Sequence, residues 1–92
     1  MQKDFSKSMP TFHLLITSPE KNLFNESVVS ATFLGADGYF EILANHAALI
    51  AVIKSGTVEI TDKEQEKHFI EIQGGFLEFL HNKATLLCYP SS

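Results

Sequence analysis

The sequence has no tryptophan, a single cysteine and no long run of uncharged apolar residues. Because Cys88 is the only cysteine, no internal disulfide can form, and the fold must be held by its core. The longest uncharged apolar stretch, residues 47–53, is far too short to span a bilayer as a helix. Residues 1–10 carry charges and no apolar segment, which excludes a typical secretory signal.

Basic charge is also scarce. Seven Lys and Arg residues stand against eleven Asp and Glu residues, which gives a formal net charge of −4. No basic stripe of the kind that binds nucleic acid is present, so no nucleic-acid partner is expected. The same acidity argues against direct docking on an anionic lipid surface. The remaining composition, 45% hydrophobic over 92 residues, is that of one small globular domain.

The sequence is rich in β-strand patterns separated by turn signals. Short runs alternate apolar with polar residues, beginning with 11–17 and 23–34 and ending with 76–80 and 84–89. Turns separate these runs every 8–12 residues or so, as in all-β domains. We therefore predict an all-β fold, a flattened antiparallel β-sandwich or barrel of about seven to ten short strands. Residues 47–53 fit either a short helix or a short strand by propensity.

The strongest hairpin signal is Asp37-Gly38, because both residue types tolerate the positive φ that a type I′ turn requires. With these two residues as the loop, Phe33 lies opposite Ile42. Both of these side chains then point into the core, whereas Glu41 lies on the other, mixed face. A half-buried antiparallel pair is therefore predicted on the two sides of this turn.

A second backbone signal is the glycine pair Gly74-Gly75, which interrupts two strand-like runs. Paired glycines between strands mark a bulge or a corner, where the chain bends or another backbone comes close. Residues 76–80 follow as a predicted strand in which Glu78 points outward between apolar neighbours.

Residue types that carry catalysis are present but form no recognisable motif. None of the four histidines lies at metal-ligand spacing from another histidine or from Cys88, so no metal and no cofactor are expected. His46 falls in a predicted loop between two core strands, where functional residues collect. As a general base it would need a nucleophile, and no serine or cysteine in a recognisable elbow accompanies it. Cys88 lies in an apolar run and is expected to pack in the core.

The segment 41–50, Glu-Ile-Leu-Ala-Asn-His-Ala-Ala-Leu-Ile, resembles a known family. It is similar to the Gly-Ile/Val-Leu/Tyr-Pro-x-His-Ala-Pro-Leu-Leu segment of the epsilon subunit of F-type ATP synthase, called delta in mitochondria. Further segments resemble the same family in the same order, at 12–20, 23–29, 54–58, 72–78 and 84–87. Each motif is weak alone, but their order and spacing are specific. The resemblance covers residues 11 to about 89, the family's N-terminal β-sandwich domain.

The resemblance implies a non-catalytic subunit in the central stalk of the rotor. Such a sandwich, of about ten strands, joins the gamma subunit to the membrane c-ring and couples proton or sodium translocation to ATP synthesis. It implies a peripheral position at the cytoplasmic face of the bacterial inner membrane. The domain organisation expected is a flexible arm at 1–10, the sandwich at 11–90 and a tail at 91–92.

The resemblance also implies where the partners bind. The family's ring-facing loops match residues 35–39 and 45–46, and one bent tip is expected to present Tyr39 and His46 together. The expected c-ring side consists of Asp37, Tyr39, Glu41, Asn45 and His46. Tyr39 is an expected anchor, because tyrosine is enriched at interfaces. For the gamma side we expect an exposed apolar strip with Phe69 and Phe79, because eight phenylalanines compete for one small core.

Some features depart from the family pattern. Ala44 and Ala48 stand where prolines are usual, which predicts a looser loop at a cost of about 0.4–1 kcal/mol each. Family members typically continue into a helical hairpin that can brake ATP hydrolysis and, in some members, binds ATP. Because this sequence stops at Ser92, a short form or a truncated chain is expected, and no nucleotide is expected to bind.

Two other functions stay open. The first is a stand-alone β-sandwich binding module for a peptide or another small ligand such as a sugar or lipid. It predicts a concave apolar pocket with a few convergent polar groups. The second is a small hydrolase that uses His46, and it predicts loss of an activity when this residue is replaced.

Overall fold

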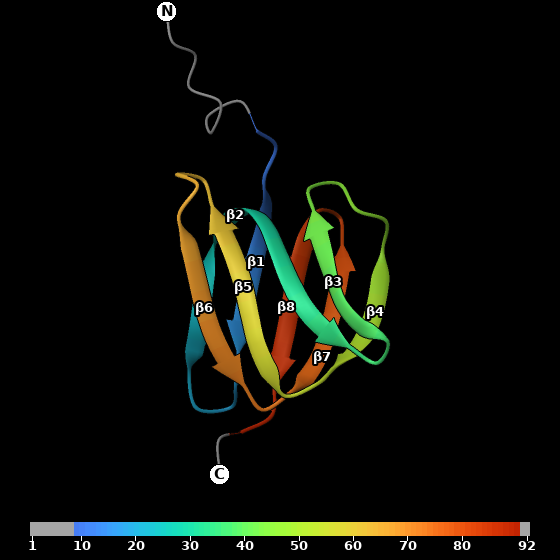
Figure 1. The fold of residues 1–92 in the computed structure, drawn as a ribbon. Coiled ribbons are helices and arrows are strands. Elements are labelled where there is room, and N and C mark those ends of the chain that lie inside the picture. Colours follow the sequence, from blue (N-terminus) through green and yellow to red (C-terminus); the bar gives the residue numbers. More distant parts are fainter. Residues whose placement is uncertain (1–8, 91–92) are drawn as a thin grey trace, which may run out of the picture.

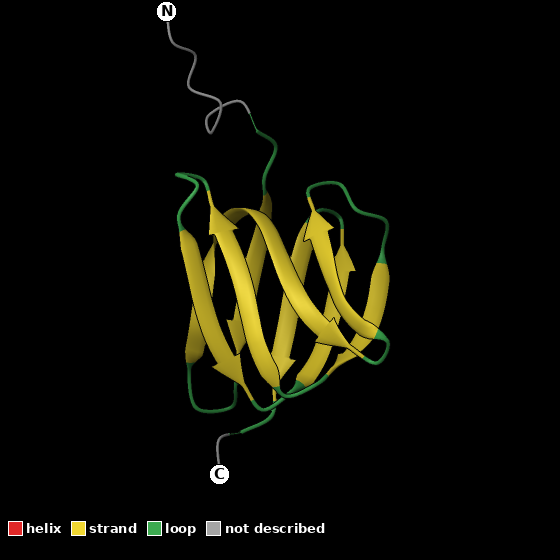
Figure 2. Cartoon of the chain, viewed as in Figure 1, coloured by secondary structure: helices red, strands yellow, loops and turns green. Residues whose placement is uncertain are grey.

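The computed structural model describes residues 9–90, which form an all-β fold of eight strands (Figures 1 and 2). The strands are β1 (Phe12–Thr17), β2 (Asn22–Gly35), β3 (Gly38–Leu43), β4 (Leu49–Ile53), β5 (Gly56–Asp62), β6 (Lys67–Ile72), β7 (Gly75–Leu80) and β8 (Lys83–Cys88). None of the described residues belongs to a helix long and apolar enough to cross a membrane. Residues 1–8 and 91–92, which contain most of the predicted arm and the tail, lie outside the described residues.

The long strand β2 belongs to both layers of the sandwich. Its first half pairs with β1, in a back layer that continues through β8 and β7 to β4. Its second half pairs with β3 and β5, in a front layer completed by β6. The change of layer falls at Val28, which pairs with Phe12 of β1 and with Asp62 of β5. Figure 1 shows β2 passing over the upper edge of the molecule, so this one strand contributes to both layers. Eight strands therefore suffice to form the predicted sandwich.

Two further features of the sheet are decided only in the fold. β1 and β8 run parallel, from His13 opposite Lys83 to Thr17 opposite Leu87. Most of the stretch that fits either helix or strand, Leu49–Ile53, forms β4, which pairs with β7 along its whole length. Cross-strand pairing thus decides a segment that propensity leaves ambiguous.

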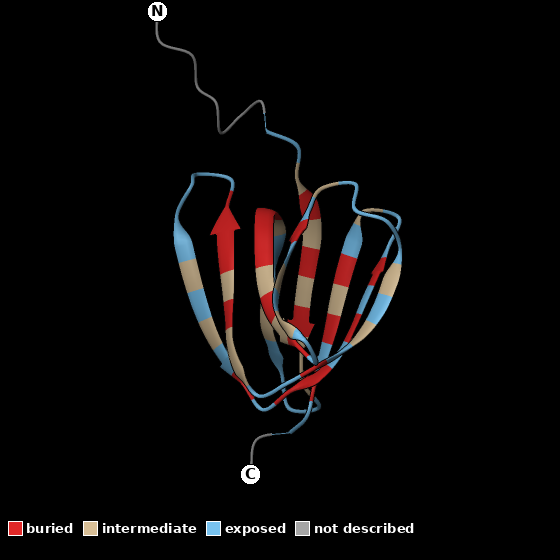
Figure 3. Cartoon of the chain, turned by 45° about the vertical axis from the view of Figure 1, so that its right-hand side comes forward, coloured by how far each residue is buried: buried red, intermediate tan, exposed pale blue. Residues whose placement is uncertain are grey.

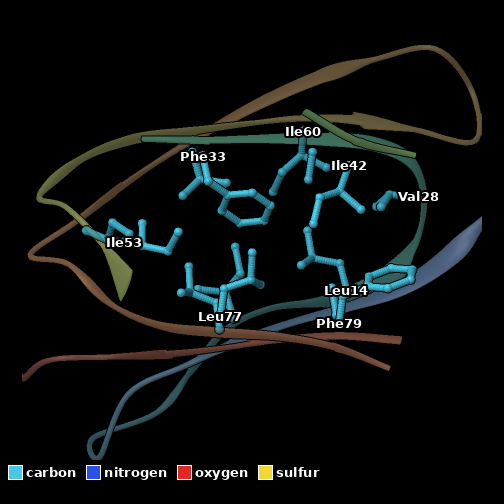
Figure 4. Close-up of a cluster of buried hydrophobic side chains, with 14 of the residues drawn as sticks. Leu14, Val28, Phe33, Ile42, Ile53, Ile60, Leu77 and Phe79 are labelled. Atoms are coloured by element: carbon cyan, nitrogen blue, oxygen red, sulfur yellow. The ribbon is translucent and has the colours of Figure 1, made fainter. Parts of the chain in front are cut away.

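The core lies between the two layers and receives apolar side chains from every strand (Figure 4). Burial alternates along most strands, which appears as coloured bands in Figure 3. The buried cluster consists of Phe12, Leu14, Ile16, Val28, Ala31, Phe33, Ile42, Ile53, Val58, Ile60, Ile72, Leu77, Phe79, Ala84, Leu86 and Cys88. The predicted burial of Cys88 is confirmed, and this burial raises the pKa of its thiol.

The β2–β3 hairpin confirms the predicted faces but corrects the predicted loop. The loop is Ala36-Asp37, and Gly38, with a φ of 122°, is the first residue of β3. The register is therefore shifted by two residues, and Phe33 pairs with Phe40 instead of Ile42. Because side chains alternate with a period of two, this shift leaves Phe33 and Ile42 in the core.

Asp62 organises the β5–β6 loop at the upper edge. Its Oδ1 accepts hydrogen bonds from the backbone N–H groups of Glu64 and Glu66, each at 2.9 Å. Its Oδ2 lies 2.8 Å from Nε2 of His68, whose ring packs edge-on against Phe24. The hydrogen bond with His68 and those from the two loop amides hold the pKa of Asp62 below its ordinary value.

We expect acid to destabilise the protein through Asp62. Its pKa is lower in the folded chain than in the unfolded chain. Its contribution to the free energy of unfolding is therefore full above the ordinary value of 3.8 and is lost as the pH falls through the folded pKa. Asp62→Asn removes this titration, so the variant should lose less stability than the wild type between about pH 5 and about pH 3. Thermal unfolding at several pH values measures the difference, and equal acid sensitivity of both proteins would contradict it.

Candidate docking surfaces

β3 presents the predicted ring-facing residues along one exposed strip. Tyr39, Glu41 and Leu43 alternate with inward-facing residues, so all three point away from the core, and Tyr39 is 65% exposed. The turn before the strand and the loop after it add three more exposed residues. The β3 strip is defined as Asp37, Tyr39, Glu41, Leu43, Asn45 and His46. The strip thus contains every residue predicted for the c-ring side.

The β3 strip is extended, which corrects the expectation of a single bent tip. Asp37 and Tyr39 lie at the lower end of β3 in Figure 1, and the loop with His46 lies at its upper end. A strand of this length extends about 20 Å. A partner that meets both ends must therefore lie along the outside of β3.

The loop after β3 has a defined conformation. Asn45 has a φ of 65°, and its backbone N–H donates a hydrogen bond of 2.7 Å to Oδ1 of Asn82. The imidazole of His46 packs edge-on against Phe79, with 5.9 Å between the ring centroids. Nδ1 of His46 lies 2.7 Å from the carbonyl oxygen of Ala47. Because a carbonyl oxygen only accepts, Nδ1 carries the hydrogen in this contact, which leaves Nε2 as the ring nitrogen that a partner can reach.

A second surface, on the outside of the back layer, is apolar. Large hydrophobic side chains of β4, β7 and β8 are exposed there, and Ile50 reaches 79%. Val52 pairs with Phe76 across β4 and β7, and Phe76 pairs with Leu87 across β7 and β8. The apolar patch is defined as Ile50, Val52, Phe76, Leu80 and Leu87. Contiguous exposed apolar surface of this kind marks interaction sites in soluble proteins.

The expected gamma-side pair, Phe69 and Phe79, does not form an exposed strip. Phe79 is 1% exposed and packs edge to face against Phe12 in the core, with ring centroids 5.6 Å apart. It is buried because Glu78 faces outward on β7 and the next residue must then face inward. Phe69 is exposed, but it lies in the front layer opposite Glu59, away from the apolar patch.

The apolar patch has a sequence signal. Alternation around Glu78 places Phe76 and Leu80 on the outer face of the same strand. The strand assignment of β4 then places Ile50 and Val52 beside them. What the sequence does not reveal is the pairing of β4 with β7, which joins these side chains into one surface.

Catalytic and metal-binding groups do not converge in the described part of the chain. Between residues 9 and 90, no three His, Cys, Asp or Glu side chains lie together as a metal site requires. Nδ1 of His46 is engaged by the backbone of Ala47, and His68 by the carboxylate of Asp62. The two exposed surfaces differ in character: the one on the back layer is apolar, and the one on β3 is polar and aromatic.

The described residues thus form a small all-β sandwich with two unlike exposed surfaces. Residues 11–89 match the family described as ATP synthase, delta/epsilon chain, beta-sandwich domain. The chain therefore belongs to the ATP synthase epsilon chain family, whose epsilon chain is a non-catalytic subunit of the ATP synthase. The resemblance predicted from the six sequence segments is thus confirmed.

Relatives of known identity agree with this assignment. The chain is 46% identical over 76 residues to the ATP synthase epsilon chain of Protochlamydia amoebophila, covering 83% of this chain and 52% of the relative. It is 39% identical over 82 residues to the epsilon chain of Chlorobium limicola, covering 89% of this chain and 93% of that one. The chain thus spans about half the length of the first relative and nearly all of the second.

Solved structures share the fold at low identity. A chain of the Euglena gracilis mitochondrial ATP synthase superposes with a TM-score of 0.80 at 20% identity, covering 87% of this chain and 52% of that chain. A chain from the central stalk and c-ring of the Tetrahymena thermophila mitochondrial ATP synthase gives a TM-score of 0.73 at 14% identity, covering 85% and 63%. At such identities the likeness supports the fold alone.

Proposed function

We propose that the chain joins the gamma subunit to the c-ring and thereby couples proton or sodium translocation to ATP synthesis. The observation that carries the proposal is the presence of two unlike exposed surfaces on one closely packed sandwich. A close-packed core transmits strain with little deformation, which suits a part that passes torque between two partners. The position proposed is the cytoplasmic face of the bacterial inner membrane, in keeping with the bacterial relatives.

The apolar patch is the proposed surface for gamma. Interfaces between subunits that stay together are more hydrophobic than transient ones, and a chain that passes torque from gamma needs such a lasting interface with it. Val52, Phe76 and Leu87 form a continuous cross-strand row at the centre of the patch. Glu78 lies within it, opposite Ile50, and supplies one charged group that can fix the register of a partner.

The β3 strip is the proposed surface for the c-ring. Its groups are polar or amphipathic: the phenol of Tyr39, the carboxylate of Glu41 and Nε2 of His46. Such groups suit the polar loops of a membrane ring better than the apolar patch does, because a partner's charged and amide groups can be paired there. Asp37 and Asn45 extend the same surface at its two ends.

Tyr39→Asp and His46→Asp test the proposed ring-facing surface. Both side chains are exposed, so the free energy of unfolding should change by less than about 1 kcal/mol. Affinity of the chain, in complex with gamma, for the detergent-solubilised c-ring should fall about tenfold or more. Lys63→Asp, in the exposed β5–β6 loop, is the control and should bind like the wild type. Normal binding by both test variants would show that the ring-facing surface lies elsewhere.

A further inference from the structure

Asn82, in the turn between β7 and β8, connects three segments at the upper edge of the sandwich. Its Oδ1 accepts a hydrogen bond of 2.7 Å from the backbone N–H of Asn45, in the loop after β3. Its Nδ2 donates a hydrogen bond of 2.8 Å to the carbonyl oxygen of Thr11, just before β1. Its own carbonyl oxygen accepts from the N–H of His13 at 3.2 Å. One amide side chain thus uses both of its ends to bridge segments that are distant in sequence.

The backbone conformation fixes the direction of this side chain. Asn82 has a φ of 61°, and the preceding His81 has a φ of 51°. Asn45, on the other side of the hydrogen bond, has a φ of 65°. Asparagine tolerates this left-handed region better than most residues do. Asn82 therefore combines the turn conformation with both side-chain hydrogen bonds, whereas Asn45 contributes its backbone N–H and a tolerated positive φ.

The loop that Asn82 holds has few other ties. Among the hydrogen bonds of the described residues, the one to Asn82 links the loop to a different segment. The others are local, from the N–H of His46 to Leu43 at 3.3 Å and from Nδ1 of His46 to Ala47. Ala44, at the start of the loop, does not restrict the backbone as a proline would. Packing of Ala44 against the core and contact of His46 with Phe79 also hold the loop, and the bond to Asn82 adds the hydrogen bond that ties it to a distant segment.

We propose that Asn82 is a positioning residue for the loop that carries His46. By holding the N–H of Asn45, it fixes the direction in which His46 offers Nε2 to the c-ring. The benefit is preorganisation, because a loop that is already ordered loses less conformational entropy when the partner binds. This inference rests on the proposed function of the β3 strip.

Two substitutions separate the parts of this arrangement. Asn82→Gly keeps the positive φ without penalty and removes both side-chain hydrogen bonds. Asn82→Asp keeps an oxygen that accepts from Asn45 but replaces the donor to Thr11. His81→Gly is the matched control, because it introduces the same glycine at a neighbouring positive φ and leaves the bridge in place.

Hydrogen exchange of the backbone amide of Asn45, measured by NMR, reports directly on its hydrogen bond to Oδ1 of Asn82. Asn82→Gly should speed this exchange about three- to tenfold, the factor that corresponds to one net hydrogen bond, whereas Asn82→Asp and His81→Gly should leave it near the wild-type rate. Affinity of the gamma-bound chain for the solubilised c-ring should fall by a similar factor in Asn82→Gly alone. The midpoint of thermal unfolding of each variant shows whether a loss of affinity comes from general destabilisation instead.

Each other result overturns the proposal. Unchanged exchange of Asn45 in Asn82→Gly would show that Asn82 does not hold the loop. Equal loss of affinity in Asn82→Asp and Asn82→Gly would place the effect at Thr11. Faster exchange with normal affinity would show that the held loop does not serve binding. In that last case the binding of His46→Asp separates the two proposals. If His46→Asp binds the c-ring weakly, the proposed c-ring surface stands and only the role of Asn82 is wrong. If it binds normally, both the role of Asn82 and the proposed c-ring surface are wrong.

Discussion

Gly75→Ala is expected to prevent the protein from folding stably. A Cβ atom on Gly75 would lie 2.1 Å from the carbonyl oxygen of Leu87 and 2.9 Å from Cα of Cys88. Both atoms belong to the backbone of β8, which pairs with β7 at this position, so no side-chain rotation can relieve the clash. Overpacking costs about 1–3 kcal/mol where neighbours can move, and here they cannot, so we expect a loss of about 3 kcal/mol or more. That is a large part of the stability of a small domain.

Urea unfolding followed by circular dichroism measures this loss, with the soluble yield as a second readout. Gly38→Ala is the matched control, because a Cβ atom there meets nothing within 4 Å and only the φ of 122° opposes the alanine. We expect the control to lose about 1–2 kcal/mol and to remain folded. An unfolding midpoint for Gly75→Ala equal to that of the wild type would contradict the prediction.

The glycine pair also shows how far backbone signals can be read from sequence. Gly74-Gly75 predicts that another backbone comes close, and the structure confirms this at both residues. A Cβ atom on Gly74 would lie 2.9 Å from the carbonyl oxygen of Ile53, and one on Gly75 would meet Leu87. The sequence cannot name these neighbours, because they lie at the ends of β4 and β8, which reach the corner through long-range pairing.

Faces are easier to predict than register. Around the β2–β3 turn, the sequence predicts a positive φ at both Asp37 and Gly38, but of these two Gly38 alone has it. Gly38 also opens the strand instead of closing the loop. The resulting shift of two residues changes every pair and preserves every face, because alternation repeats after two residues. The core positions of Phe33 and Ile42 are therefore correct although their predicted pairing is not.

Long-range arrangement is where the sequence carries least information. The parallel pairing of β1 with β8 joins the two ends of the described chain. No turn connects these two strands directly, so no local sequence pattern predicts that they are neighbours. The c-ring candidates all lie at exposed positions, but the length of β3 that separates Tyr39 from His46 appears only in the fold. The prediction that Phe79 is exposed on the gamma side is wrong for a different reason. It rests on the number of phenylalanines, which does not show which face of a strand each one occupies. The outward position of Glu78 already determines that Phe79 is buried.

Phe76→Asp is expected to abolish stable docking on gamma while the sandwich stays folded. Phe76 is 49% exposed and lies at the centre of the apolar patch, paired with Val52 on one side and Leu87 on the other. A carboxylate at this place would be buried against the partner without a counter-charge, which typically costs several kcal/mol. Affinity for gamma should therefore fall about a hundredfold or more. On the free protein, the change affects an exposed strand position and should cost no more than about 1 kcal/mol.

Phe69→Asp is the matched control, because it makes the same replacement on an exposed strand position of the front layer. Binding of each variant to purified gamma, measured by calorimetry, compares the two faces directly, and thermal unfolding verifies that both variants are folded. Weak binding by Phe76→Asp together with normal binding by Phe69→Asp would assign gamma to the back layer. The reverse pattern would assign gamma to the front layer at Phe69, and the apolar patch would then lose its proposed role. Since both replacements add the same charge to a β-strand, the difference between them isolates the position of the interface from the effect of charge alone.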